Sequence, residues 1–436
     1  MTQQKIAARR AGANREQAAP EKRQSLPDFA GRLMDYEEAL AECLSAVAEP
    51  LAPEPVALID SLGRILQEKV ESPLAVPSFN KSTMDGYAVK SVDVEDASAE
   101  APVVLRVVDE VPAGGFSGKT LRSGEAVRIM TGAAVPDGAD AVIKIEKTGA
   151  VDQSRISILD GVGENNYIIP RGRDLLPGQE VASPGLEVDP ILIGILASCG
   201  IAEVKVSRKP AIGIISTGSE LVPPGQVLPE GCIYDINGFF LHGFLQKTGV
   251  DVSPPERVSD KSAELLAALE RNKDKDILLL SGGVSVGDYD IVHETLQKAG
   301  VREIFWRVRV KPGKPLFFGQ KGTTLIFGLP GNPVSSATNF FLFVKPVIDK
   351  LLGKKEWGLQ SGYARVLNSR ILRPGRRKFL KGQIRTGAAD QRVWIIAEQR
   401  SGVFSPMKEA DVFIEVPENV KLVKEGELVK VHYLPQ

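Results

Sequence analysis

The chain has 436 residues, 43% of them hydrophobic and 25% charged, a composition that is ordinary for a soluble globular protein of about two to four domains. With 54 basic and 55 acidic residues the net charge is −1, so bulk charge favours neither a nucleic-acid partner nor a membrane surface. No apolar run approaches the ~20 residues that span a bilayer, and the N-terminus lacks the apolar core of a secretory signal. The cysteines and histidines are scattered without metal-ligand spacing, which indicates a reducing cytoplasm and a metal that is either a substrate or held by oxygen ligands.

The chain begins with a segment that lacks apolar periodicity. Residues 1–32 are rich in Gln, Ala, Arg and Pro, so we expect a disordered tail. From Met34 to Val47 the apolar residues recur at helical spacing, and a second helical stretch is expected from Ala57 to Gln67.

Short strands separated by Gly and Pro turns follow, in a pattern typical of a small β-rich module. Val103–Val108 and Ala141–Lys147 are two of these expected strands. After them, Pro190–Ser198 is predicted to be a helix and Glu203–Ser207 a strand.

Residues 209–354 alternate buried strands with amphipathic helices, and this order predicts a mostly parallel, doubly wound α/β domain. Its last helix opens at Asn332-Pro333, with Asn as N-cap and Pro at the first helical position, where the missing N–H costs nothing. Ser259 or Asp260 is expected to cap an earlier helix. The expected strands are 211–216, 276–280, 303–310, 316–319 and 324–328, and the other expected helices are 237–248, 259–271 and 288–299.

The predicted fold class is therefore multidomain α/β plus β. The segments 33–70 and 174–208 are expected to form one interrupted N-terminal domain, with the β-rich module 71–173 inserted between them. The α/β domain 209–354 follows, and short strands with turns over 355–436 indicate a small C-terminal β-barrel.

Three loops of the α/β domain follow predicted strands, and open α/β sheets bind ligands at the carboxyl ends of their strands. Glycines let backbone N–H groups approach an anion closely, and a helix N-terminus adds a favourable partial charge. One such loop alone is most simply a tight turn, but three at one sheet edge indicate a cradle for phosphate or another oxyanion. The candidate binding residues are Ser216, Thr217 and Gly218 in the first loop, Ser281, Gly282, Gly283, Ser285 and Gly287 in the second, and Pro330, Gly331, Asn332 and Pro333 in the third.

Cations gather at the end of the expected 303–310 strand. Strand alternation places Arg307, Arg309 and Lys311 on one face, and prolines stiffen the turn from Lys311 to Lys314. A row of cations facing a phosphate cradle suits a polyanionic ligand. A solvated edge strand is the alternative that the sequence leaves open.

Glu220, Asp260, Asp288 and Asp290 are candidate carboxylates at the same edge. Mg²⁺ is typically held by one or two carboxylates together with phosphate oxygens, so Glu220, Asp260 and Asp290 are candidate magnesium ligands. For each acid taken singly, a helix cap or a surface position is the commoner role.

Three polar loops in the N-terminal half, here called corners, give weaker evidence of function. They are residues 80–88, 128–133 and 171–174, and an Asp-Gly pair such as Asp85-Gly86 often only makes a turn. Composition alone gives no reason to prefer a function for them.

The loops and corners together resemble one known family. The segments STMDGYAV, RIMTGAAVPDGADAV, RGRDLLPG, STGSELV, SGGVSVGDYD, KPGKP and GLPGNPVSSA occur in this order. The series is similar to the molybdopterin molybdenumtransferase family, which includes the C-terminal (E) domain of gephyrin, and the similarity covers residues 33–436.

The resemblance implies an elongated subunit of four parts that forms a homodimer, with the active site between the α/β domain of one subunit and the β module of the other. It implies insertion of molybdate into adenylylated molybdopterin with Mg²⁺, which yields molybdenum cofactor and AMP. It also implies transient contact with the preceding adenylyltransferase and with downstream molybdoenzymes. Whether molybdate or tungstate is preferred is left open, because the two oxyanions have nearly the same size and charge.

The same resemblance implies roles for individual residues. Arg307 is expected to stand where relatives carry Lys, and the forked guanidinium is not equivalent to a compact ammonium around an oxyanion. Lys314 joins the substrate-binding set. The catalytic face contributed across the dimer would contain Asp85, Thr131 and Asp174, and the pterin–nucleotide face would contain Glu220, Asp260, Asp290, Arg307, Lys311 and the Pro330/Pro333 corner.

Three other hypotheses compete with this one. An adenylyltransferase of the preceding step needs only a unit like 210–352, and the flanking modules argue against it. A non-catalytic dimeric scaffold would use a peptide groove, which nothing in the tail or loops marks. A generic nucleotide-binding module leaves the N-terminal corners unexplained.

Overall fold

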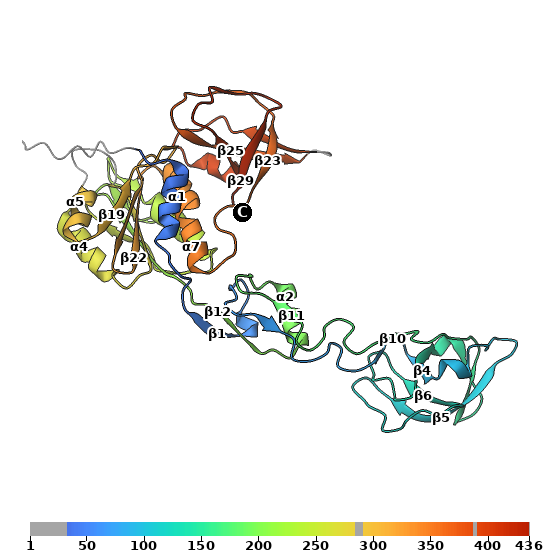
Figure 1. Ribbon diagram of the computed structural model, residues 1–436. Helices are drawn as coiled ribbons and strands as arrows, with labels where there is room; N and C mark the ends of the chain where they lie inside the picture. The colour runs from blue at the N-terminus through green and yellow to red at the C-terminus, as the bar shows by residue number, and fades with distance from the viewer. Residues whose placement is uncertain (1–32, 284–290, 387–389, 436) are drawn as a thin grey trace, which may run out of the picture.

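The protein is described by a computed structural model that covers residues 33–283, 291–386 and 390–435 (Figure 1). The chain is elongated, with the α/β domain and the C-terminal barrel together at one end and the β-rich module at the other. No helix among the described residues is long and apolar enough to cross a bilayer. The tail expected over residues 1–32 lies outside the described residues.

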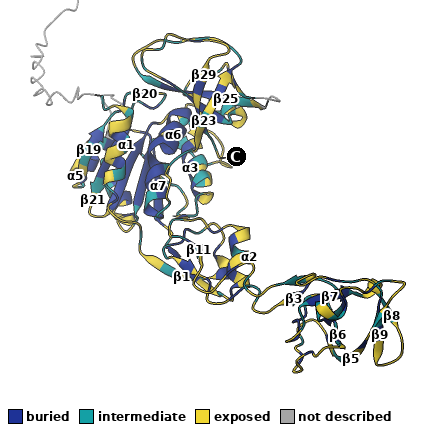
Figure 2. Ribbon diagram, turned by 45° about the vertical axis from the view of Figure 1, so that its right-hand side comes forward, coloured by how far each residue is buried: buried dark blue, intermediate teal, exposed yellow. Residues whose placement is uncertain are grey.

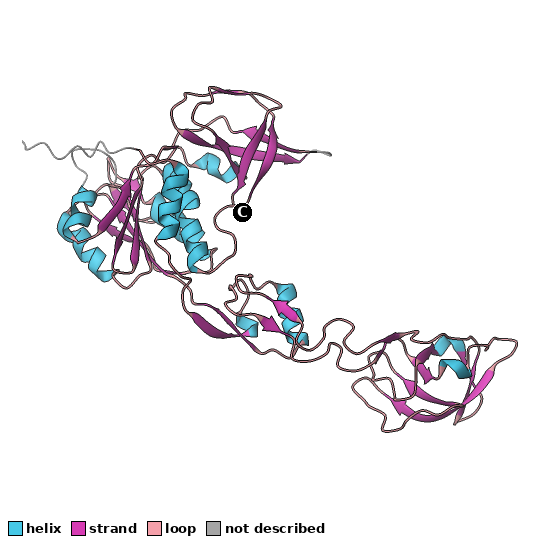
Figure 3. Cartoon of the chain, viewed as in Figure 1, coloured by secondary structure: helices cyan, strands magenta, loops and turns pink. Residues whose placement is uncertain are grey.

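A sheet of seven strands forms the centre of the α/β domain (Figure 3). The strands are β13 (Ala211–Thr217), β16 (Asp251–Val252), β17 (Glu256–Val258), β18 (Ile277–Ser281), β19 (Arg302–Trp306), β21 (Phe317–Lys321) and β22 (Thr324–Leu329). Their order is β16-β13-β18-β22-β21-β19, and β17 also pairs with β13. The pairings among β13, β16, β17, β18 and β22 are parallel, while β21 and β19 form an antiparallel edge, so the prediction of a mostly parallel sheet is confirmed.

Helices cover both faces of this sheet, as a doubly wound fold requires. Strand alternation divides the core: Leu279 packs with the helices of one face, and Leu278 and Leu280 pack with those of the other. The central strands of the sheet are largely buried (Figure 2). Truncating a buried phenylalanine such as Phe318 to Ala in such a core costs about 3–5 kcal/mol. One face holds α1 (Tyr36–Ser45), α3 (Ile236–Gln246), α6 (Pro333–Asn339) and α7 (Lys345–Leu351), and the other holds α4 (Ser262–Arg271) and α5 (Ile291–Lys298).

α6 and α7 belong to one long helix with a π-helical turn, Phe340–Val344, between them. Asn332 is the N-cap and Pro333 takes the first helical position, as predicted, although the Asn332 side chain makes no capping hydrogen bond. The buried Asn339 precedes the π turn, and its Nδ2 donates to the carbonyl oxygens of Gly313 and Pro315 at 3.1 Å each. The Lys311–Lys314 turn is therefore anchored on the helix as well as stiffened by its prolines.

α1 (Tyr36–Ser45) lies in the core of the α/β domain, although β13, the first strand of that sheet along the chain, begins only at Ala211. Ala39 and Cys43 belong to the main apolar cluster, and the Tyr36 ring meets the Phe343 ring edge-on at 5.7 Å. The sequence division placed this segment with residues up to 70; its apolar face instead packs on the π turn and α7.

A thin middle part connects the α/β domain to the insert (Figure 1). The helix expected over Ala57–Gln67 is wrong, because the segment holds a 3₁₀ turn (Leu58–Asp60) followed by bridges from Ile65 and Leu66. Gly63, with φ +74°, breaks the helical path, and Ile65 and Leu66 are buried in bridge pairings instead. The elements here are β1 (Pro53–Ala57) paired with β12 (Glu203–Ser207), β2 (Val70–Glu71) paired with β11 (Glu180–Ala182), and α2 (Pro190–Ser198).

The β-rich module is a six-stranded sheet with apolar clusters on its two faces. Its order is β7 (Ala141–Lys144), β4 (Gly86–Val89), β6 (Glu125–Ile129), β5 (Val103–Val111), β9 (Arg155–Ile158) and β8 (Thr148–Ala150). A short pair, β3 (Lys81–Ser82) with β10 (Ile168–Ile169), lies where the chain enters and leaves the module.

The C-terminal domain is a closed barrel of five strands. They are β23 (Ser361–Val366), β25 (Arg377–Thr386), β26 (Gln391–Ile395), β27 (Val412–Val416) and β29 (Leu428–Tyr433), with a small pair β24 (Arg370–Ile371) and β28 (Leu422–Val423) beside them. The pairing of β25 with β27 closes the ring and confirms the predicted barrel. β20 (Val310–Lys311), from the α/β segment of the chain, adds to β25 in parallel.

Candidate functional site

A cleft of about 1170 Å³ lies at the carboxyl ends of β13, β18 and β22. All three predicted loops reach it, so the structure brings together residues that are far apart in the sequence. Ser216, at the end of β13, is buried beneath the cleft. The predicted residues that line the cleft are Thr217, Gly218, Glu220, Asp260, Ser281, Gly282, Gly283, Gly331, Asn332 and Pro333.

The glycines of this cleft allow close packing between its loops. A Cβ on Gly282, which has φ +94°, would lie 2.4 Å from the Thr217 carbonyl oxygen. The Gly282 amide donates to Leu329 O at 3.1 Å, and the Gly218 amide donates to Val258 O at 3.1 Å. Both amides are thus already bonded within the protein, although both glycines line the cleft, and their predicted role in binding an anion stays a prediction.

Asn237 holds two of the loops together, and sequence reasoning missed it. Its Nδ2 donates to Ser281 Oγ at 2.8 Å and to Gly331 O at 2.9 Å. It lies in the first turn of α3, whose N-cap Asp235 accepts the Gly238 amide at 2.9 Å. The signal in the sequence was a pair of polar residues, Asp235 and Asn237, at the start of an apolar helix. Both are buried, and both line the cleft.

Two of the predicted acids line the cleft with exposed side chains. Asp260 Oδ2 accepts the Ser219 amide at 2.9 Å, and the Asp260 amide donates back to Ser219 Oγ at 3.2 Å. The prediction that Ser259 or Asp260 caps α4 is wrong: Lys261 is the N-cap, and Asp260 is held by the first loop instead. Glu220 folds back beside Gly218, where a Cβ would lie 2.7 Å from Glu220 Oε2.

These two carboxylates fit part of a magnesium site. No group of three or more His, Cys, Asp or Glu side chains among the described residues could hold a metal, so Glu220 and Asp260 would need oxygens from the substrate. Asp290, the third predicted ligand, lies outside the described residues, as do Asp288, Ser285 and Gly287.

A second cleft, of about 1050 Å³, lies between the Lys311–Pro315 turn and the barrel. It shares Asn332 and Gly402 with the first cleft, so the two are continuous. The sequence assigned Lys311 and Lys314 to the site but nothing from the barrel, although the basic run at 373–378 was visible. The cations that line this cationic cleft are Lys311, Lys314, Arg370, Arg373, Arg376, Lys378 and Arg400, against one acid, Glu398.

Two barrel lysines show how strongly this region is charged. Lys378 is 3% exposed, and burial together with the neighbouring cations Lys311 and Arg376 lowers its pKa. Lys381 is 1% exposed, its Nζ has no hydrogen-bond partner among the described residues, and burial lowers its pKa as well. An anion in the cleft would stabilise the charged form of Lys378, which lines it.

Arg307 does not join the other predicted cations. The strand expected over 303–310 is confirmed only as far as Trp306, where β19 ends, and Arg307 has a left-handed φ of +81°. Its guanidinium lies over the Trp306 ring at 4.6 Å, and it lines neither cleft. Arg309 pairs with Asp35 at 2.9 Å, so among the three cations expected on one face only Lys311 enters the cationic cleft.

The N-terminal corners lie in the β-rich module, at the opposite end of the subunit from both clefts (Figure 1). Asp85 Oδ1 accepts the Thr131 amide at 2.6 Å and the Thr131 hydroxyl at 2.8 Å, and these bonds lower the pKa of Asp85. Gly86 is required here by close packing rather than by a turn, since a Cβ would lie 1.8 Å from Ile143 O. Asp174 is exposed, and its amide donates to Val76 O at 3.0 Å.

Fold and clefts together define a class of protein: a multidomain α/β protein with a cleft at its strand ends, beside a C-terminal barrel whose cations line a second cleft. Family models agree in detail. A model of the MoeA N-terminal region (domains I and II) matches residues 34–200, one of a probable molybdopterin binding domain matches 213–350, and one of the MoeA C-terminal region (domain IV) matches 363–434.

Individual relatives extend the match to most of the chain. It is 34% identical over 402 residues to the molybdopterin molybdenumtransferase of Haemophilus influenzae, which covers 92% of this chain and 98% of the relative. The Bacillus subtilis molybdopterin molybdenumtransferase is 38% identical over 303 residues, or 68% of this chain and 70% of the relative. A crystal structure of the molybdopterin biosynthesis moeA protein from Pyrococcus horikosii has a TM-score of 0.79 at 33% identity, covering 92% of this chain and 99% of that one. The chain belongs to the molybdopterin molybdenumtransferase family.

Proposed function

We propose that this protein inserts molybdate into adenylylated molybdopterin with Mg²⁺, releasing AMP and molybdenum cofactor. The observation that carries the proposal is the continuity of two clefts with opposite chemistry, which meet at Asn332 and Gly402. One offers carboxylates and the other a group of cations, so one elongated polyanion and one small oxyanion can be held side by side. A cytoplasmic location is part of the proposal.

The strand-end cleft would hold the nucleotide part of the substrate. Glu220 and Asp260 would hold Mg²⁺ there, where the metal would draw charge from the phosphate as AMP leaves. The bond from the Ser219 amide keeps the Asp260 carboxylate in place. Asn237 fixes the separation of the second and third loops, so the cleft is formed before substrate arrives.

The cationic cleft would hold molybdate and the substrate's acidic groups. Lys311 and Lys314 approach from the α/β side, and the barrel supplies the remaining cations. Such fixed positive charge in a partly enclosed cleft stabilises negative charge more than water does. The dithiolene sulfurs belong to the substrate, which agrees with a protein that brings no cysteine cluster to this region.

We propose further that the active unit is a homodimer in which Asp85, Thr131 and Asp174 of a second subunit complete the site. Within one chain the Asp85 corner cannot reach the clefts, because the elongated shape separates them (Figure 1). The middle part also carries apolar side chains that suit association: Ile59 is 82% exposed and Ile191 is 72% exposed.

The proposed reaction is tested by giving the purified protein adenylylated molybdopterin and Mg²⁺, with and without molybdate, and measuring AMP. We expect AMP release to depend on both molybdate and Mg²⁺. AMP release indifferent to molybdate would contradict the proposal, and net adenylylation of free molybdopterin from ATP would identify the adenylyltransferase alternative. Parallel reactions with tungstate would measure the preference between the two oxyanions.

The shared site is tested by mixing subunits with different defects. Asp85→Asn damages the corner in the β module, and Lys311→Ala damages the cationic cleft. Verified heterodimers of the two contain one intact site, so we expect them to regain up to about half of the wild-type activity per dimer. Heterodimers as inactive as either parent would exclude a site built from two subunits.

A further inference from the structure

The cationic cleft has a wall made of two strands from different domains. β20 pairs in parallel with β25, with Val310 opposite Arg377 and Lys311 opposite Lys378. The Arg377 amide donates to Arg309 O at 3.1 Å, and Arg376 Nη1 donates to Val310 O at 3.3 Å. The position of Lys311 relative to the barrel cations therefore depends on this short pairing.

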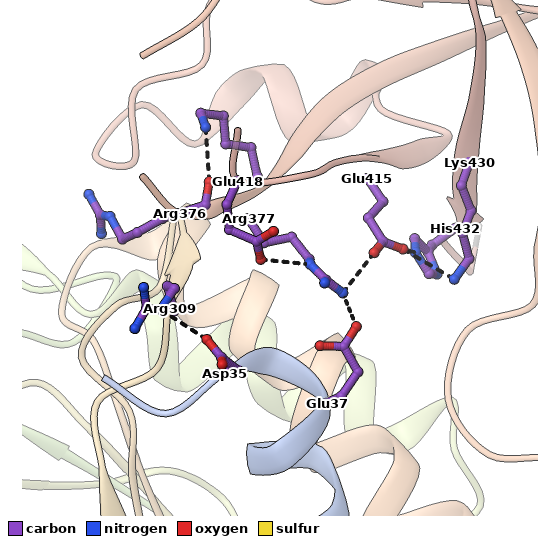
Figure 4. A network of polar contacts seen from close by, with 10 residues as sticks. Asp35, Glu37, Arg309, Arg376, Arg377, Glu415, Glu418, Lys430 and His432 are labelled. Carbon is purple, nitrogen blue, oxygen red and sulfur yellow. Dashed lines mark hydrogen bonds and ion pairs between the residues drawn. The ribbon is translucent and has the colours of Figure 1, made fainter. Parts of the chain in front are cut away.

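Arg377 points away from the cleft, toward a group of acids. Alternation along the strand turns its neighbours Arg376 and Lys378 to the cleft, where both are part of the lining. Its guanidinium binds Glu415 at 3.0 Å and Glu418 at 3.1 Å in the barrel, and it also binds Glu37 at the start of α1 (Figure 4). We call Glu37, Arg377, Glu415 and Glu418 the clamp.

The clamp is well supported on the barrel side. Glu415 Oε2 accepts from His432 Nε2 at 2.9 Å and lies 3.2 Å from Lys430 Nζ. The bond to His432, helped by Lys430, lowers the pKa of Glu415 to about 2. Glu415 and Glu418 belong to the barrel, whereas Glu37 belongs to a helix that packs in the α/β core. Within the clamp, the Glu37 contact is the one that joins the two domains.

The cleft side of the same strands works against close pairing. Lys311 lies on one strand and Arg376 and Lys378 on the other; all three are cations that line the cleft, and of the three Lys378 is buried. Like charges repel more strongly where one of them is buried, and burial together with Lys311 and Arg376 lowers the pKa of Lys378. The inter-domain ion pair on the reverse side opposes this repulsion.

We propose that the clamp is a positioning device: Arg377, through Glu37, holds β20 against β25 and so sets the width of the cationic cleft before an anion binds. The identity of that anion as molybdate rests on the proposed function, but the effect on the strands does not. When the clamp is weakened, the strands separate more often, and an anion must first bring Lys311 back toward the barrel cations.

The full-length protein tests this with Glu37→Gln and Arg377→Met against two controls. Glu42→Gln removes an exposed charge from the same helix outside the clamp, and Arg377→Lys keeps the charge while losing the forked geometry. Amide hydrogen exchange of the unliganded proteins is followed in peptides covering 308–316 and 376–382. We expect exchange about fivefold faster in Glu37→Gln, more in Arg377→Met, partial rescue in Arg377→Lys and no change in Glu42→Gln.

The second readout is molybdate-dependent AMP release. We expect the half-saturating molybdate concentration to rise about fivefold in Glu37→Gln while the rate at saturating molybdate falls less than twofold, because a bound anion restores the wall. The proposed role of the clamp would be overturned if hydrogen exchange in Glu37→Gln were unchanged. It would also be overturned if the rate at saturating molybdate fell by as large a factor as the half-saturating concentration rose. A wild-type protein that releases no AMP would overturn the proposed function alone, since the exchange comparison needs no substrate.

Discussion

The two clefts are neighbours, yet they are built in different ways. The strand-end cleft comes from one domain, and its shape is fixed by loops packed so closely that glycine is required at Gly282 and an amide bridge at Asn237. The cationic cleft comes from two domains, and its shape depends on a strand pairing two residues long. The first is shaped by close packing between loops, whereas the second has cations facing one another on one side of the strand pair and ion pairs on the other. Substitutions in the strand-end cleft should therefore change mainly the stability of the protein or the catalytic rate. Substitutions in the cationic cleft should change mainly the affinity for the anion.

The largest effect is expected for the acids of the strand-end cleft. Glu220→Gln and Asp260→Asn should each lower the rate at saturating substrate by about 100-fold or more, because a carboxylate that holds the metal at the phosphate is lost. Asn at 260 can still accept the Ser219 amide, so the fold should remain. Asp274→Asn, an exposed acid before the amino end of β18, is the control. Rates within a factor of three of the control would remove both acids from the chemistry.

Close packing predicts a large loss of stability at Gly282. Gly282 and Gly322 both have positive φ, but only a Cβ on Gly282 would clash, whereas the space around Gly322 is open. Gly322→Ala should cost about 1 kcal/mol for the backbone alone, and Gly282→Ala about 2–4 kcal/mol. Thermal unfolding measures both. Equal shifts in the two variants would mean that the loops yield easily and that the strand-end cleft is not rigid.

In the cationic cleft, Lys378→Met should lower the affinity for molybdate. The half-saturating concentration of molybdate should rise about tenfold, because one cation is lost, and its dependence on salt should become shallower. Melting temperature should stay within a few degrees or rise, since the substitution also removes a buried cation that Lys311 and Arg376 repel. A large drop in melting temperature with unchanged affinity would show that this cleft, too, is a packing structure.

The smallest effect is expected at the Asp85 corner. Its pKa is lowered by the Thr131 bonds, so the favourable effect of those bonds is complete above the ordinary carboxyl pKa and is lost as pH falls through the lowered value. Thr131→Val removes the hydroxyl bond and should raise the pKa of Asp85 part of the way to its ordinary value, while Thr131→Ser should not. Carboxyl NMR titration measures the shift. An identical pKa in all three proteins would leave the backbone amide as the sole cause.

The sequence predicted the strand-end cleft better than the cationic one, for a physical reason. Loops such as 281–283 follow strands whose burial pattern is clear, and parallel strand ends must meet at one edge, so their meeting was predictable. Arg307 was misplaced because a positive φ in a non-glycine residue has no signal in local composition. The barrel cations were missed because a contact between residues 311 and 378 depends on how two domains dock. Asn237 was passed over since a polar residue in a first helical turn is usually only a cap.

The π-helical turn determines the direction in which α6 presents its side chains to the site. Such a turn holds one more residue than a regular helix, and each residue turns an α-helix by about 100°. The extra residue within Phe340–Val344 therefore sets the direction in which α6 presents Asn339 relative to the face that α7 buries. Deleting one residue there would restore a regular helix and rotate Asn339 away from Gly313 and Pro315, so that the Lys311–Lys314 turn would lose its anchor without a single change in the turn itself.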